Sequence, residues 1–121
     1  MPSQQLRVGL VGFGFAGQTF HAPVVSAVPG LELAAIASSQ PEKVQAQWPG
    51  VAVFPELHAL LAPQPPVDLV VVATPNEAHF PVAKAALEAG RHVVVDKPFT
   101  LDAAQALELG HLAHARRKLV S

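Results

Sequence analysis

Cysteine and tyrosine are absent from the 121-residue sequence, which has one methionine and one tryptophan. The lack of cysteine excludes disulfide bonds, thiolate metal ligands and a cysteine nucleophile. Charged residues make up only 14% of the chain and the formal net charge is −1, which argues against nucleic-acid or membrane binding through a basic surface. Residues 8–13 lack the features of a signal peptide, and the longest apolar run, 69–73, is too short to cross a bilayer. We therefore expect a cytoplasmic protein.

Short apolar runs alternate with helical patterns along the whole chain. Strands are expected at residues 6–11, 31–37, 51–54, 68–72 and 92–95, and residues 119–121 resemble the start of another strand. Helices are expected at 16–20, 41–48, 56–62, a segment ending at Ala89, and 102–117. Pro23 breaks or restarts the first helix, and Gly90 is expected to cap the fourth in a left-handed conformation. This order predicts one α/β domain over residues 1–121, a doubly wound parallel sheet in three layers.

A glycine-rich turn stands directly between the first strand and the first helix. Gly12, Gly14 and Gly17 match G-x-G-x-x-G, in which the glycines permit a tight turn, approach to a pyrophosphate and close helix–strand packing. The amides of Phe15 and Ala16 would point at the phosphates from a helix N-terminus. The pattern predicts dinucleotide binding. The alternatives are a tight turn that binds nothing, or the similar turns of flavoproteins and methyltransferases.

The end of the second strand bears on the choice between NAD and NADP. An NAD site usually has a carboxylate there to bind the ribose 2′-hydroxyl. This chain has Ser38 and Ser39 instead, with Lys43 nearby, and two hydroxyls and an ammonium group can bind a 2′-phosphate. We therefore expect NADP to be preferred over NAD. The alternatives are an ordinary loop with a solvated Lys43, or NAD binding by Glu42.

Two further motifs follow the fourth and fifth strands, namely Thr74-Pro75-Asn76-Glu77-Ala78-His79 and Asp96-Lys97-Pro98. Together with the glycine turn, they resemble the N-terminal domain of the glucose–fructose oxidoreductase / inositol dehydrogenase / MocA family. The sequence His21-Ala22-Pro23 is similar to the sugar- and inositol-type members. The resemblance covers essentially the whole chain and implies a Rossmann-type fold.

The resemblance also implies roles for individual residues. It places the side chains of the first motif, Thr74, Pro75, Asn76 and His79, beside the ribose and diphosphate of the cofactor. It places Lys97 beside the nicotinamide and the substrate hydroxyls, where a lysine can hydrogen-bond a reacting oxygen, and Asp96 and Pro98 hold that turn. The alternatives are a surface lysine at 97 and a helix-capping histidine at 79.

The resemblance implies hydride transfer between NADP or NAD and a sugar, inositol or similar polyol. Enzymes of this family carry a second, mainly β-sheet domain that supplies the substrate pocket, an acid/base histidine and the dimer interface. We interpret residues 1–121 as the cofactor domain without that partner, inactive alone and part of a homo-oligomer in full-length form. The alternatives are a stand-alone nucleotide-binding or redox-sensing module and, less favoured, a methyltransferase-like domain that binds an adenosyl group.

No metal site is expected from the sequence. His111 and His114 have the spacing of metal ligands on a helix, but no third ligand is evident. We expect both to be exposed near the helix C-terminus, where positive charge is favoured. Residues 116–118 are interpreted as the basic end of the same helix.

Overall fold

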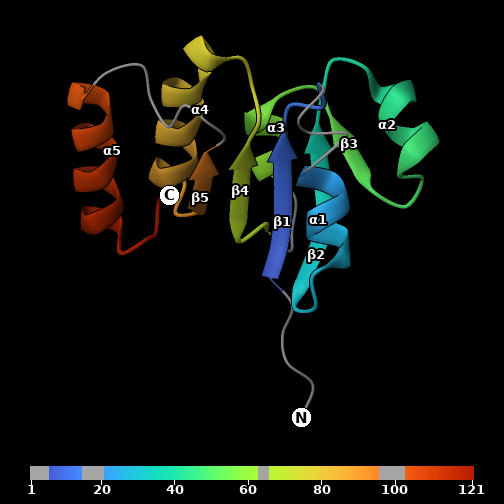
Figure 1. Ribbon diagram of the computed structural model, residues 1–121, viewed down its shortest axis with the longest axis horizontal. Helices are drawn as coiled ribbons and strands as arrows, with labels where there is room; N and C mark the ends of the chain where they lie inside the picture. Colours follow the sequence, from blue (N-terminus) through green and yellow to red (C-terminus); the bar gives the residue numbers. More distant parts are fainter. Residues whose placement is uncertain (1–5, 15–20, 63–65, 96–102) are drawn as a thin grey trace.

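Five parallel strands form the centre of the protein, with helices on both faces (Figure 1). The computed structural model describes residues 6–14, 21–62, 66–95 and 103–121. The elements, in chain order, are β1 (Leu6–Val11), α1 (Ala22–Ala27), β2 (Leu31–Ala37), α2 (Pro41–Gln47), β3 (Ala52–Phe54), α3 (Leu57–Leu61), β4 (Leu69–Val72), α4 (Asn76–Glu88), β5 (His92–Val95) and α5 (Ala103–Arg116). The expected α/β fold is confirmed.

The sheet has the strand order β3-β2-β1-β4-β5, and every neighbouring pair is parallel. The chain runs outward from β1 to β3 and then returns to the other side of β1 to form β4 and β5. The order therefore reverses between β1 and β4. In open parallel sheets this switch point, at the carboxyl ends of the strands, is where ligands bind.

Two apolar cores lie on opposite faces of the sheet. On one face α3, α4 and α5 cover the strands, with Leu60, Leu87 and Leu109 fully buried. On the other face α1 and α2 pack through Val25 and Val44. The strands are apolar toward both faces because both are covered, which is typical of parallel sheets.

The helices begin and end close to where the proline and glycine positions predict, with small differences from the expected bounds. Gly90 has a φ of +81° after α4, which confirms the left-handed cap. Helix α1 begins at Ala22 with Pro23 in its first turn, which confirms a helix start there, whereas the expected helix at 16–20 lies outside the described residues. Helix α4 begins at Asn76, expected in a loop, because Pro75 is already the N-cap and accepts a hydrogen bond from the Ala78 N–H.

The last residues of the chain pair with β5. Val120 forms a parallel bridge with Val93, and the Val93 N–H donates to the Leu119 carbonyl at 2.9 Å. The Ser121 N–H donates in turn to the Val93 carbonyl at 3.0 Å. The strand-like character expected for residues 119–121 is therefore confirmed.

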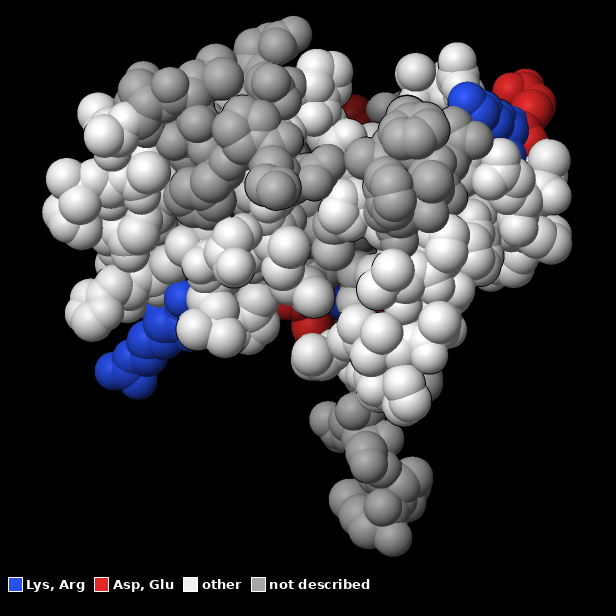
Figure 2. Space-filling model, viewed as in Figure 1, with Lys and Arg blue, Asp and Glu red and all other residues white. Residues whose placement is uncertain are grey.

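Charged side chains are scattered over the face shown in Figure 2, with no broad field of one sign. They are visible over α2 at the upper right, near the lower end of α5 at the lower left, and in a small area near the centre (Figures 1 and 2). None of the helices in the described ranges has both the length and the apolar character needed to span a bilayer.

Candidate functional site

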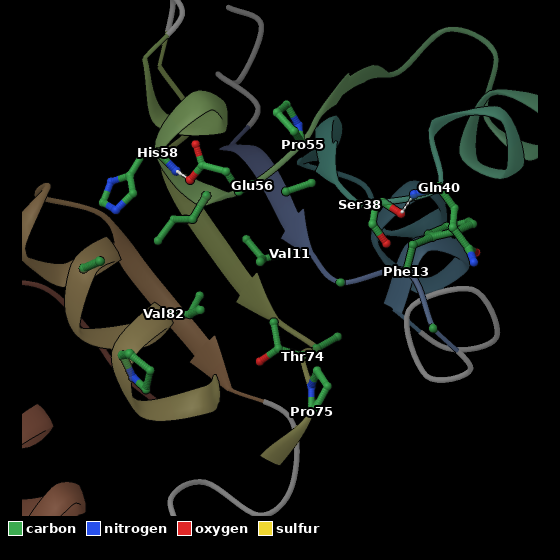
Figure 3. Close-up of a pocket in the computed structure, with 18 residues that line it drawn as sticks. Val11, Phe13, Ser38, Gln40, Pro55, Glu56, His58, Thr74, Pro75 and Val82 are labelled. Carbon is green, nitrogen blue, oxygen red and sulfur yellow. Dashed lines mark hydrogen bonds between the residues drawn. The ribbon is translucent and has the colours of Figure 1, made fainter. Parts of the chain in front are cut away.

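A pocket of about 800 Å³ opens at the carboxyl ends of β1, β2 and β4, which is the switch point of the sheet. Its wall is formed by three groups of residues from different loops. They are residues 11–14 at the end of β1, residues 37–40 at the end of β2 and residues 73–75 after β4 (Figure 3). Residues 55–58 and Pro81, Val82 and Ala85 complete the wall from α3 and α4.

The turn after β1 requires glycine at its first position. Gly12 has a φ of +102°, and a Cβ atom there would lie 2.6 Å from the carbonyl oxygen of Ala73. The Gly12 N–H donates to the Ala37 carbonyl at 2.9 Å, so the turn is fixed between β2 and β4. A Cβ at Gly14, by contrast, would meet no atom within 4 Å. Backbone is thus exposed to the pocket at Gly14, as a phosphate-binding turn needs. Phe15, Ala16 and Gly17 lie outside the described residues.

The loop after β2 brings two of the three predicted 2′-phosphate ligands to the pocket. Ser38 and Ser39 line the wall together with Gln40. The Ser38 N–H donates to the Phe54 carbonyl, and its Oγ accepts a hydrogen bond from the Gln40 N–H at 3.0 Å. Because Oγ only accepts there, the hydroxyl proton can still be donated to a ligand. Lys43 is exposed in the first turn of α2 and does not form part of the wall.

The loop after β4 contributes Thr74 and Pro75 to the wall. The Thr74 Oγ1 atom is buried and has no hydrogen-bond partner among the described residues. An unpaired buried hydroxyl is costly, so this atom is suited to a polar ligand atom in the pocket. Asn76 begins α4, and its side chain lies outside what the structure describes.

His79 is buried next to the loop after β4 and is not part of the pocket wall. Its side chain is 1% exposed, and its Nε2 is 2.8 Å from the Thr74 carbonyl oxygen. A carbonyl can only accept, so Nε2 carries the proton and donates it to this bond. His79 therefore holds the Thr74 main chain through this hydrogen bond and does not itself line the pocket. The motif Asp96-Lys97-Pro98 lies outside the described residues, directly after β5.

Part of the wall comes from residues that the sequence motifs did not indicate. Residues 55–58 follow β3, and Glu56 is the N-cap of α3. Their position after a parallel strand is a signal that could have been used, because such strand ends converge on one edge of the sheet. Pro81, Val82 and Ala85 come from the middle of α4 and carry no comparable signal.

The described wall of the pocket contains no lysine or arginine, and its only ionisable side chains are Glu56 and His58. Elsewhere, hydrogen bonding to Glu108 and the charge of that carboxylate raise the pKa of Lys84, with a smaller contribution from Glu88. The Lys84–Glu108 ion pair, at 2.9 Å, joins α4 to α5 and takes no part in the site. His111 and His114 are exposed as expected, and the described residues contain no cluster suited to a metal ion.

Together these residues fit a nicotinamide dinucleotide. Gly14 exposes main chain with no Cβ in the way, Ser38 retains a donor, and the buried Thr74 hydroxyl has no hydrogen-bond partner within the described part of the chain.

Comparisons with known proteins agree with this architecture. Residues 6–121 match the model of the oxidoreductase family with an NAD-binding Rossmann fold, GFO_IDH_MocA. The uncharacterized oxidoreductase YdgJ of Escherichia coli is 54% identical over 119 residues, which cover 98% of this chain and 34% of that protein. The NADP(+) enzyme scyllo-inositol 2-dehydrogenase IolW of Bacillus subtilis is 32% identical over 116 residues, covering 96% of this chain and 32% of that protein.

A solved structure shows the same fold. An oxidoreductase of Klebsiella pneumoniae superposes with a TM-score of 0.93 at 49% identity, covering 98% of this chain and 34% of that one. The chain thus spans about a third of the length of the relatives that it matches. The match of residues 6–121 to the family model confirms the family resemblance that the three motifs indicate.

Proposed function

Because the chain belongs to the oxidoreductase family with an NAD-binding Rossmann fold, we propose that it is the cofactor domain of an enzyme that oxidises or reduces a sugar or polyol. The observation that carries the proposal is the turn at Gly12 and Gly14, constrained at the first glycine and open to the pocket at the second. The similarity to scyllo-inositol 2-dehydrogenase (NADP(+)) IolW of B. subtilis supports the substrate class. When bound, the cofactor supplies the hydride acceptor or donor.

Different residues of the pocket bind different parts of the cofactor. Main-chain N–H groups of the glycine turn bind the diphosphate, and Thr74 and Pro75 lie against the ribose nearer to the nicotinamide. His79 contributes indirectly, by donating a hydrogen bond to the Thr74 carbonyl. Asn76, whose backbone begins α4, is assigned to the same ribose and diphosphate region.

We further propose that NADP is preferred over NAD. No carboxylate stands at Ser38 or Ser39 to bind a 2′-hydroxyl or repel a 2′-phosphate, and both residues line the pocket. Lys43 is not part of the described wall, whereas Ser38 and Ser39 are. The preference for NADP should therefore depend more on the two serine hydroxyls and the nearby main chain than on the Lys43 ammonium group. A hydrogen bond to a charged group contributes about 1.5–3 kcal/mol.

Lys97 is proposed as the catalytic residue. It follows β5, whose carboxyl end lies at the same edge of the sheet as the pocket. Its ammonium group donates a hydrogen bond to the reacting substrate oxygen, and Asp96 and Pro98 position it. We expect Lys97→Met to leave NADPH affinity within about 1 kcal/mol, as for one exposed contact. In an enzyme that has its substrate domain, the same change should lower turnover by ~10²-fold or more.

The proposal is tested by titrating the chain with NADPH and NADH and following the fluorescence of the reduced nicotinamide. Gly14→Val should abolish binding, because its side chain fills the place of the diphosphate. Gly50→Val is the matched control, since Gly50 also has open space around its Cβ position and lies away from the pocket. Binding by Gly14→Val with the affinity of the wild type would show that the phosphate-binding turn is wrongly assigned.

A further inference from the structure

The end of the chain lies beside β5, where main-chain hydrogen bonds hold it (Figure 1). We call residues 119–121 the terminal segment. The Val93 N–H donates to the Leu119 carbonyl, the Ser121 N–H donates to the Val93 carbonyl, and the Val95 N–H donates to the Ser121 carbonyl at 2.7 Å. These bonds extend the parallel sheet by one short edge segment.

A side chain supplies the next bond of this ladder. Because the Ser121 N–H donates to Val93, a regular parallel ladder would pair the Leu119 N–H with the Arg91 carbonyl. The Leu119 N–H instead donates to Nδ1 of the His92 ring at 3.0 Å. His92 therefore fastens the first residue of the terminal segment to β5.

The bond to His92 requires an uncharged imidazole. An N–H can only donate, so Nδ1 must have a free lone pair and the ring proton is on Nε2. A protonated imidazolium has a proton on both nitrogens and therefore no acceptor. We propose that His92 is a pH-sensitive latch, which holds the terminal segment on β5 while its ring is neutral and releases it when the ring takes up a proton.

The direction of the pH dependence follows from the form of the ring that accepts the bond. Imidazole takes up its proton between about pH 5 and 8. The neutral ring is the form above that range, so the bond is present there and is lost as the pH falls through it. Leu119 is 75% exposed and His92 is half-buried, so the ring can exchange its proton with solvent.

Neighbouring ionisable groups cannot replace Nδ1 as the acceptor. Among the described residues, those on the elements packed against His92 are Asp68 before β4, Lys84 and Glu88 on α4, Arg91 before β5, and Arg117 and Lys118 before the terminal segment. The Asp68 carboxylate already accepts the Arg7 N–H at 2.9 Å. Arginine and lysine side chains only donate.

Helix α4 lies on the opposite face of the sheet from the His92 ring. Val93 and Val95 belong to the same core as Leu87 of α4, and side chains alternate between the two faces along a strand. His92 and Val94 therefore point to the other face. The carboxylate of Glu88 and the ammonium group of Lys84 are separated from the latch by the sheet.

Release of the latch exposes the edge of β5. The N–H groups of Val93 and Val95 donate to the terminal segment, so they lose their partners when it leaves. Strand β5 is the one that leads into the turn at residues 96–98. The charge of His92 is thereby linked to the pairing of this edge, and the inference does not depend on the proposed cofactor.

Amide hydrogen exchange of the 121-residue chain, followed by NMR at about pH 5 and about pH 8, tests the latch. The rates are converted to protection factors, which removes the intrinsic effect of pH on exchange. The amides of Val93, Val95 and Ser121 should lose about 3- to 10-fold in protection at the lower pH, as expected for the loss of one hydrogen bond. Amides of the central strand β1 should keep their protection at both pH values.

Two substitutions at residue 92 separate the charge of the ring from its place in the fold. His92→Asn puts a carbonyl oxygen close to the position of Nδ1, so protection should be similar at the two pH values. His92→Val keeps a good strand residue without an acceptor, so protection of the same amides should be low at both pH values. His111→Asn changes an exposed histidine on α5 and should leave the response of the wild type unchanged.

Two outcomes would overturn the latch. One is a wild type in which the three amides have equal protection factors at both pH values. The other is a His92→Asn variant that loses protection at the lower pH as the wild type does, because another group would then be responsible.

Discussion

The hydrogen bond between His79 and Thr74 allows a prediction that separates support of the pocket from direct contact with a ligand. His79 is 1% exposed, and its Nε2 donates to the Thr74 carbonyl over 2.8 Å. Leucine is similar in bulk to histidine but apolar, so His79→Leu removes the Nε2–H donor to the Thr74 carbonyl. Loss of this bond should lower the free energy of unfolding by about 1–3 kcal/mol, the range for leaving a buried partner unsatisfied.

His79→Gln is the informative comparison. The glutamine amide nitrogen can occupy the place of Nε2 and donate to the same carbonyl, so this variant should recover at least half of the lost stability. In urea unfolding we expect the order wild type, His79→Gln, His79→Leu. For a chain of this size the leucine variant should melt roughly 3–6 °C lower for each kcal/mol lost.

Ligand binding completes the test. Because His79 supports Thr74 and does not line the pocket, His79→Gln should keep NADPH affinity within about threefold, or roughly 0.7 kcal/mol. The reasoning is refuted if His79→Leu is as stable as the wild type, or if His79→Gln folds normally yet loses NADPH binding. The second result would mean that the histidine itself contacts the cofactor.

Three further substitutions test separate parts of the structure. Gly12→Ala should destabilise the chain by about 2 kcal/mol or more in urea unfolding, since it combines a positive φ with a Cβ placed 2.6 Å from the Ala73 oxygen; a neutral effect would contradict the turn. Ser38→Asp keeps an acceptor for the Gln40 N–H but should reverse or erase the preference for NADPH over NADH, measured as two dissociation constants. The pKa of Lys84 is raised above its ordinary 10.5 by Glu108, so the ion pair stabilises the fold below that pH and is lost as the pH rises through the raised pKa. The stability difference between the wild type and Lys84→Met should therefore be present at pH 8 and shrink above pH 11, and a difference that persists there would argue against the ion pair.

The fold could be predicted from local chemistry because each strand and helix carries its own signals. Gly90 has the left-handed conformation that its place after α4 predicts, and Gly12, predicted in a tight turn, also has a positive φ that favours glycine. Proline placed the start of α2 correctly for a similar reason, since Pro41 suits a first turn. The local sequence pattern does not specify which strands become neighbours, so the strand order comes from the structure.

The candidate site was predicted less completely, because its wall depends on packing between distant segments. Helix α3 approaches β1 so closely that a Cβ at Gly9 would lie 2.7 Å from Leu60 Cδ2. That contact brings Glu56 and His58 to the pocket edge, and the sequence around Gly9 does not indicate it. Lys43 lies in the first turn of α2 and is not part of the described wall, so its contact with a 2′-phosphate stays a prediction.

The charges of the pocket bear on the direction in which a bound dinucleotide lies. The described wall has no lysine or arginine, so phosphate groups must be held by main-chain N–H groups and hydroxyls at the end that contains Gly14 and Ser38. The opposite end carries the carboxylate of Glu56. A phosphate placed about 4 Å from that carboxylate would be repelled by roughly 1 to 4 kcal/mol for each unit charge, depending on how well water screens the pair. The same carboxylate attracts the amino group of a base. One acidic side chain therefore favours the orientation with the phosphates at the glycine turn and the base against α3 and α4, and disfavours the reverse.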